Sequence, residues 1–208
     1  MRQLLAVLAA YADQLVPATA LAGELAVHTP AEQTRTVLLD SVHRLRGLLA
    51  GAADAAGRRT PETVLVSLPG GYLLDTGGGR SDLREFAREA GAGYRAMSRR
   101  EFETAARRLR GALGLWRGPA FDGIAAGPLL AERIEGLEQT RRSVLTQWVE
   151  AQLALGRHRE LRAELRTAGA GRALDTYPEL ARVLGPDFGR SPAVTTRAVR
   201  RTLLGGVI

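Results

Sequence analysis

The chain has 208 residues, a formal net charge of +7 and no cysteine. This length allows one large domain or two small ones, and the lack of cysteine excludes disulfides, thiolate metal sites and cysteine nucleophiles. Hydrophobic residues make up 45% and aromatic residues 5%, which excludes a disordered chain and favours aliphatic helices over a β-rich sandwich. No stretch approaches the ~18 apolar residues of a membrane span, so we expect a cytoplasmic protein without a membrane partner.

Every basic residue is an arginine, and the isoelectric point is near 11.0. This balance indicates an anionic partner such as nucleic acid. A GC-rich genome, whose codons favour arginine, produces the same composition. Charge alone therefore leaves both explanations open.

Three helices are expected within the first fifty residues. Leucines at helical spacing predict a first helix over Arg2–Leu15, which Pro17 ends. A second helix is expected over Ala18–Leu25, and a third contains Thr34–Gly47. The quick succession of helices predicts a small helical domain at this end of the chain.

The third helix has an apolar side and a polar side. Its core stripe falls within about 60° on the helical wheel and consists of Leu38, Val42, Leu45 and Leu49. The far side carries Thr36, Asp40, His43 and Gly47, flanked by Arg44 and Gln33. This set is short and rich in hydrogen-bonding groups, whereas a helix that only faces water usually carries glutamate–arginine pairs four residues apart. A solvated face is the alternative explanation.

Two β-prone runs, Val64–Val66 and Tyr72–Leu74, are separated by Pro69-Gly70-Gly71 and predict a β-hairpin. Three helices followed by a hairpin are the order of a winged helix-turn-helix. In that fold the third helix enters the major groove of DNA, and the hairpin contacts phosphate or the minor groove. The pattern predicts a DNA-binding domain over residues 1–76.

The DNA-binding residues expected from this pattern are Arg35, Thr36, Asp40, His43, Arg44 and Arg46 of the third helix and Tyr72 of the hairpin. The arginines suit phosphate or guanine, while Thr36 and His43 suit base edges. Asp40 argues against this interpretation, because a carboxylate in the groove repels phosphate unless it accepts from cytosine N4.

The second half, residues 81–208, is predicted to be all-helical. Its first helix begins at Ser81, which suits an N-cap. Two helix pairs are expected to turn at Met97–Arg99 and Leu155–Arg157, as in tetratricopeptide-like stacks. The whole chain is thus predicted to be mainly α, a winged helix-turn-helix followed by a tetratricopeptide-like helical domain.

An insertion, Leu115–Ile124, separates the two helix pairs and contains glycine and proline residues that break the helix. A long helix is expected to follow over Pro128–Leu155. The large aromatic residues of this half suit a core better than a ligand platform; they are Trp116, Phe121 and Trp148.

Neither a catalytic residue nor a metal or cofactor site is expected. The three histidines, His28, His43 and His158, lack the spacing of a metal site. No glycine-rich phosphate loop followed by lysine is found. Paired carboxylates such as Glu132 and Glu135 lie among arginines, which suits surface ion pairs better than acid–base chemistry. We therefore do not expect an enzyme.

Four segments, in this order, resemble the Streptomyces antibiotic regulatory protein (SARP) family: TRTVLLDSVHRLRGLL, LPGGYLLD, AARRLRGALGLWRGPAF and LEQTRRSVLTQWVEAQLALGRHRELRAEL. An LWRGP insertion followed by a helix ending in ALGRH is typical of the family's helical bacterial transcriptional activation domain. The resemblance implies a cytoplasmic activator that binds double-stranded promoter DNA, can form a homodimer and recruits RNA polymerase to genes of secondary-metabolite (antibiotic) biosynthesis.

Three features depart from the family pattern. The small β-sheet that precedes the first helix in family members is missing, so either the start is misplaced or the winged helix is trimmed, which would leave the hairpin without its sheet partner. Leu39 and Asp40 stand where polar residues such as glutamine are common, and the helical domain lacks one helix pair after Leu165. The alternative function is a protein-interaction module of helical repeats with a degenerate winged helix that no longer binds DNA.

Overall fold

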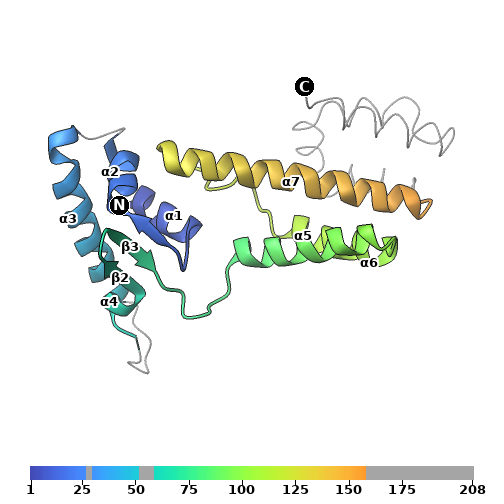
Figure 1. The fold of residues 1–208 in the computed structure, drawn as a ribbon, viewed down its shortest axis with the longest axis horizontal. Coiled ribbons are helices and arrows are strands. Elements are labelled where there is room, and N and C mark those ends of the chain that lie inside the picture. Colours follow the sequence, from blue (N-terminus) through green and yellow to red (C-terminus); the bar gives the residue numbers. More distant parts are fainter. Residues whose placement is uncertain (27–29, 52–58, 158–208) are drawn as a thin grey trace. The chain divides into compact units, whose positions relative to one another are not determined.

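The computed structural model describes residues 1–26, 30–51 and 59–157, and they are mainly helical, as predicted (Figure 1). The elements in chain order are α1 (Arg2–Ala10), β1 (Leu15–Pro17), α2 (Ala18–Ala26), α3 (Ala31–Gly51), α4 (Pro61–Val64), β2 (Leu65–Leu68), β3 (Gly71–Leu74), α5 (Asp82–Ser98), α6 (Phe102–Gly114) and α7 (Pro128–Ala154). Among the helices of these ranges, none combines the length and the hydropathy that crossing a bilayer requires.

Contacts between Cα atoms divide the chain into two compact units. We call Met1–Arg84 with Trp116–Thr140 the winged-helix unit, and Glu85–Leu115 with the residues from Arg141 onward the helical unit. The domain bounds expected from the sequence, 1–76 and 81–208, remain a prediction.

The first helix is shorter than predicted. It ends at Ala10 and not at Leu15, because the backbone of Asp13 takes a left-handed conformation, with φ = 61°. The Asp13 N–H donates to the carbonyl oxygen of Leu74 over 2.9 Å. Aspartate is one of the few non-glycine residues that adopt this conformation readily, so the turn reverses the chain and β1 follows.

Strand β1 gives the hairpin its third strand, and the expectation that the hairpin lacks a sheet partner is wrong. The sheet is antiparallel with the order β1-β3-β2, and Val16 lies opposite Tyr72. The sequence pattern missed β1 because Leu15 continues the leucine spacing of the preceding helix. Pro17 has no N–H to donate and is tolerated because β1 is an edge strand.

The predicted hairpin is confirmed, and its glycines have separate tasks. Gly70 turns the chain with φ = +87°, where side chains are disfavoured. A Cβ atom at Gly71 would stand 2.2 Å from the carbonyl oxygen of Val16. Gly71 is therefore what lets β1 approach β3 closely.

The helices α2 and α3 also agree with the sequence prediction, whereas α4 was not predicted. This single turn begins at the capping box of Thr60 and Thr63, in which each side chain bonds the other residue's backbone N–H.

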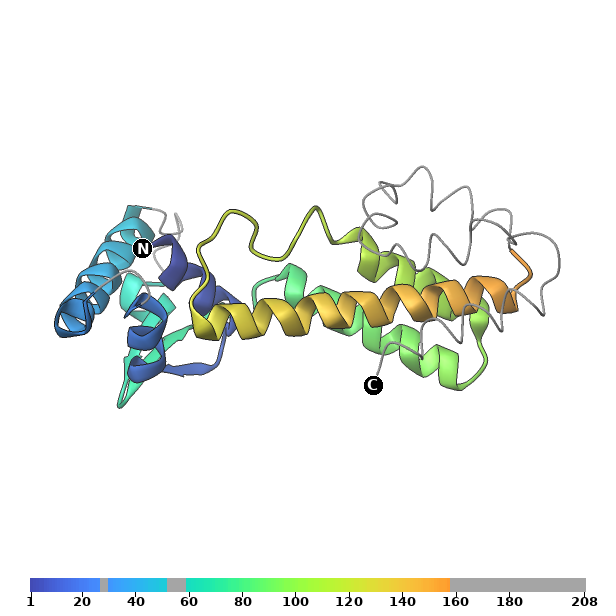
Figure 2. The same cartoon turned by 90° about the horizontal axis from the view of Figure 1, so that it is seen from above.

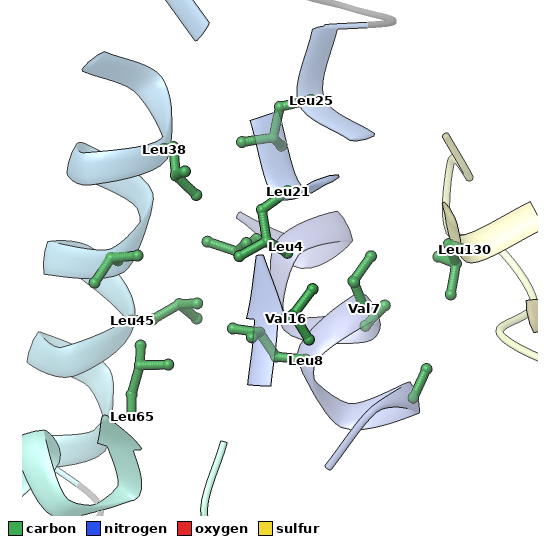
Figure 3. Packing of buried hydrophobic residues seen from close by; sticks show 13 residues of the cluster. Leu4, Val7, Leu8, Val16, Leu21, Leu25, Leu38, Leu45, Leu65 and Leu130 are labelled. Carbon is green, nitrogen blue, oxygen red and sulfur yellow. The ribbon is translucent and has the colours of Figure 1, made fainter. Parts of the chain in front are cut away.

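The core of the winged-helix unit lies between α3, α1 and the sheet (Figure 3). Its buried side chains come from six elements and include Leu4, Val7, Leu8, Val16, Leu21, Leu38, Leu45, Leu65 and Leu130. Leu130 lies on α7, far along the chain, and is fully buried. Phe121 and Ile124 of the predicted insertion pack against the same cluster. The winged helix therefore completes its core with a later segment.

A buried carboxylate fixes that later segment. Glu24 of α2 is 1% exposed and accepts from the backbone N–H groups of Gly127, Leu129 and Leu130 over 2.6, 2.9 and 3.2 Å. These groups lie at the start of α7, where backbone donors have no partner within the helix. A Cβ atom at Gly127 would stand 2.5 Å from the Glu24 carbonyl oxygen, so this approach requires glycine.

In the helical unit, α5 and α6 are joined by a turn at the predicted place. They approach closely at Gly93, where a Cβ atom would stand 2.5 Å from Leu109 Cδ2.

Helix α7 is unbroken over its predicted length (Figure 2). Trp148 is buried, as expected of a core residue, whereas Trp116 and Phe121 are half-buried. The second helix of the later pair falls outside the described residues.

We predict that Glu24→Gln lowers the free energy of unfolding by about 2 to 4 kcal/mol. The amide replaces one acceptor oxygen by a donor that faces backbone donors. Urea unfolding followed by circular dichroism measures the change. Glu132→Gln is the matched control, because Glu132 is exposed on α7 and its change should stay within about 0.5 kcal/mol. Equal stability of the two variants would contradict the role of Glu24.

Candidate nucleic-acid interface

Helix α3 is buried on one side, where Thr34 and Ser41 join the apolar stripe, and exposed on the other. Leu38, Val42 and Leu45 are each 4% exposed and belong to the core cluster, and Leu38 and Leu45 point toward α1, α2 and β1 (Figure 3). On the outer side, the exposed residues are Gln33, Arg35, Thr36, Leu39, Asp40, His43, Arg44 and Gly47. We call this set the outer face of α3. The structure thus brings five of the seven predicted DNA-binding residues together on one accessible surface.

Asp40, the residue that argued against DNA binding, is paired. Its carboxylate lies 3.0 Å from Arg44 Nε, one helical turn away, and both side chains are more than half exposed. Such an exposed pair stabilises a helix by less than about 1 kcal/mol. The pairing offsets the negative charge on the face, yet it is weak enough for Arg44 to exchange the carboxylate for a phosphate.

Arg46 differs from the other predicted residues because its guanidinium forms hydrogen bonds within the winged-helix unit. Nε and Nη2 donate to the carbonyl oxygen of Leu65 over 3.2 and 2.7 Å, and Nη2 also donates to Ser67 Oγ over 3.0 Å. Both partners lie on β2. Arg46 therefore joins the end of α3 to the hairpin and is a positioning residue. Sequence periodicity gave no signal for this contact, because the partners are 19 and 21 residues away.

Tyr72 is half-buried on β3 and packs against the core cluster. It lies between Val16 on one neighbouring strand and Ser67 on the other. Tyr72 is thus not a member of the outer face of α3. Contact of the seven residues with DNA stays a prediction.

Positioning residues that the sequence analysis did not identify fix the chain where it leaves the hairpin. Asp13 accepts from the N–H and the hydroxyl of Thr76, both over 2.7 Å, and forms an ion pair with Arg84. Arg59 lies 3.1 Å from an Asp75 carboxylate oxygen and donates to the Asp75 carbonyl. The available sequence signal was that Asp13 is a charged residue in the turn after α1. Its role became clear only when its partners were known.

The described part of the chain contains no cluster of three or more histidine, aspartate or glutamate side chains suited to a metal ion. His43 is exposed on α3. His28 and His158 fall outside the described residues.

Comparisons with known proteins agree with this architecture. Residues 81–171 match the family model of the bacterial transcriptional activator domain. The chain is 30% identical to regulatory protein DnrI of Streptomyces peucetius, over 98% of this chain and 83% of DnrI. It is 28% identical to transcriptional regulatory protein EmbR of Mycobacterium tuberculosis, and the match spans 98% of this chain but only 57% of EmbR.

A solved structure of Mycobacterium tuberculosis EmbR, in complex with a low-affinity phosphopeptide, is similar to this fold. The TM-score is 0.69 at 27% identity, with 98% of this chain and 58% of that chain covered. A winged helix followed by a bacterial transcriptional activator domain defines a class of transcriptional regulators. The chain belongs to the Streptomyces antibiotic regulatory protein family.

We predict that Arg46→Ala lowers the free energy of unfolding by about 1 to 2 kcal/mol, because the Leu65 carbonyl loses its charged donor. Arg44→Ala removes the same side chain from an exposed position on the same helix and should change stability by less than about 0.5 kcal/mol. Urea unfolding of both variants checks the difference. Equal effects would contradict the positioning role of Arg46.

Proposed function

We propose that this regulator binds promoter DNA sequence-specifically through α3 and activates genes of secondary-metabolite, antibiotic, biosynthesis by recruiting RNA polymerase. The observation that carries the DNA-binding proposal is the outer face of α3, which is exposed and polar while the opposite stripe is buried. The family, which is named for antibiotic regulators, supports the choice of target genes. The activation domain match supports contact with polymerase. The proposal includes no catalytic step.

The proposed mechanism uses two kinds of contact, one that positions the helix on DNA and one that selects the sequence. Arg35 and Arg44 bind phosphates or guanine and fix the position of the helix on the duplex, while Thr36 and His43 select base edges. Arg46 acts indirectly, because it holds the hairpin against the end of α3. Two copies bound to a direct repeat would double the contacts, as the family resemblance implies.

The DNA-binding proposal predicts a strong salt dependence. Neutralising several phosphates releases counterions, so the logarithm of the binding constant should fall linearly with the logarithm of salt concentration. Arg35→Ala and Arg44→Ala should each weaken binding and reduce this slope by about 1. Fluorescence anisotropy with a promoter-length duplex, measured from low to moderate salt, gives both quantities.

Arg107→Ala is the matched control, because Arg107 is exposed on α6 and its loss changes the net charge equally. Its salt slope should equal that of the unmodified chain. If the unmodified chain shows no binding, or binding that does not respond to salt, the chain acts instead as a protein-interaction module with a degenerate winged helix. An equal loss of slope in Arg44→Ala and Arg107→Ala would show that binding is not directed by α3.

A further inference from the structure

Leu39, on the outer face of α3, is apolar and is not expected on a surface that contacts only phosphate or water. Leu39 is 53% exposed, in the middle of the helix. Arg35 lies one turn before it and His43 one turn after it, and both are exposed. Because i and i+4 residues share a helix face, the three side chains form a row with an aliphatic residue at its centre.

An exposed leucine is common on protein surfaces and needs no explanation when it stands alone. Here its neighbours limit what can cover it. Its row contains Arg35, whereas the other two arginines of α3 are engaged elsewhere, Arg44 with Asp40 and Arg46 with Leu65 and Ser67 of β2. A row with an arginine one turn from a leucine suits a surface that offers an anionic group beside an apolar one.

The major groove of DNA offers such a surface. Phosphates line its edges, and the thymine C5-methyl group is the apolar feature among the base edges. A leucine that meets this methyl group buries apolar area on both partners. Arg35, one turn away, would at the same time reach a phosphate or a guanine.

We propose that Leu39 is a specificity-determining residue that reads the C5-methyl group of a thymine in the target site. The inference rests on the proposed function, since it requires that α3 lies in the major groove. Leu39 then sets which base is preferred at one position of the site and is not required for DNA binding as such.

The chain offers a matched control in Leu48, which is 59% exposed on the same helix. Nine residues separate it from Leu39, about two and a half turns, so it projects from the opposite side. Leu48→Ala removes the same side chain atoms as Leu39→Ala, near the far end of the helix. Both positions are exposed, so both variants should keep the fold, which thermal unfolding by circular dichroism checks.

The experiment first selects binding sites for the full chain from a pool of random duplexes. Each thymine of the selected site is then replaced singly by deoxyuridine, which removes only the methyl group, and dissociation constants are measured by anisotropy. For the unmodified chain we expect one or two replacements to weaken binding about fourfold, the factor for one buried methyl-sized group. Leu39→Ala should lose this sensitivity, and Leu48→Ala should keep it.

Two outcomes overturn the inference while the proposed function stands. In the first, the chain selects a site but no deoxyuridine replacement weakens binding. In the second, Leu39→Ala keeps the full sensitivity to deoxyuridine. The inference is overturned as well if Leu39→Ala weakens binding to all duplexes uniformly and lowers self-association, as expected if Leu39 contacts a second copy. If the unmodified chain enriches no sequence from the pool, the proposed function fails and the Leu39 inference fails with it. Leu39→Gln, which keeps the length but not the apolar contact, should also abolish the thymine preference.

Discussion

The arrangement of this protein's candidate interface depends on burial of one stripe of α3. A helix of 21 residues gains most of its stability in a protein from packing of its apolar side and not from propensity. Leu38, Val42 and Leu45 supply that packing beside the buried Thr34 and Ser41, and the other side of the helix remains exposed. Because α3 is packed on one side only, its outer face, with polar and aliphatic residues, is exposed without loss of the fold.

The arginines illustrate why composition alone left two explanations open. Some of them act within the protein: Arg46 and Arg59 bond backbone carbonyl groups, and Arg84 pairs with Asp13. Others, such as Arg35, are exposed on the outer face of α3. The planar guanidinium with its several donors suits both carbonyl and phosphate oxygens. A count of basic residues therefore overstates the charge that is available to a partner.

Local patterns predicted the elements whose stability is local. The periodicity of α2, α3 and α7 and the glycine-containing turn of the hairpin all appear within short windows of sequence. The end of α1 and strand β1 were missed, because β1 exists only by pairing with Tyr72 and its neighbours, more than fifty residues later. For the same reason, periodicity identified the outer face of α3 but not the second role of Arg46, which depends on distant acceptors.

The bond between Glu24 and the start of α7 has a consequence for how such regulators can be recombined. A fragment that stops before residue 116 would leave the Glu24 carboxylate without its donors and the core cluster without Leu130. The winged-helix unit is therefore not formed by one continuous stretch of sequence. A chimera with a relative would have to exchange the first 84 residues and residues 116–140 together to remain soundly folded.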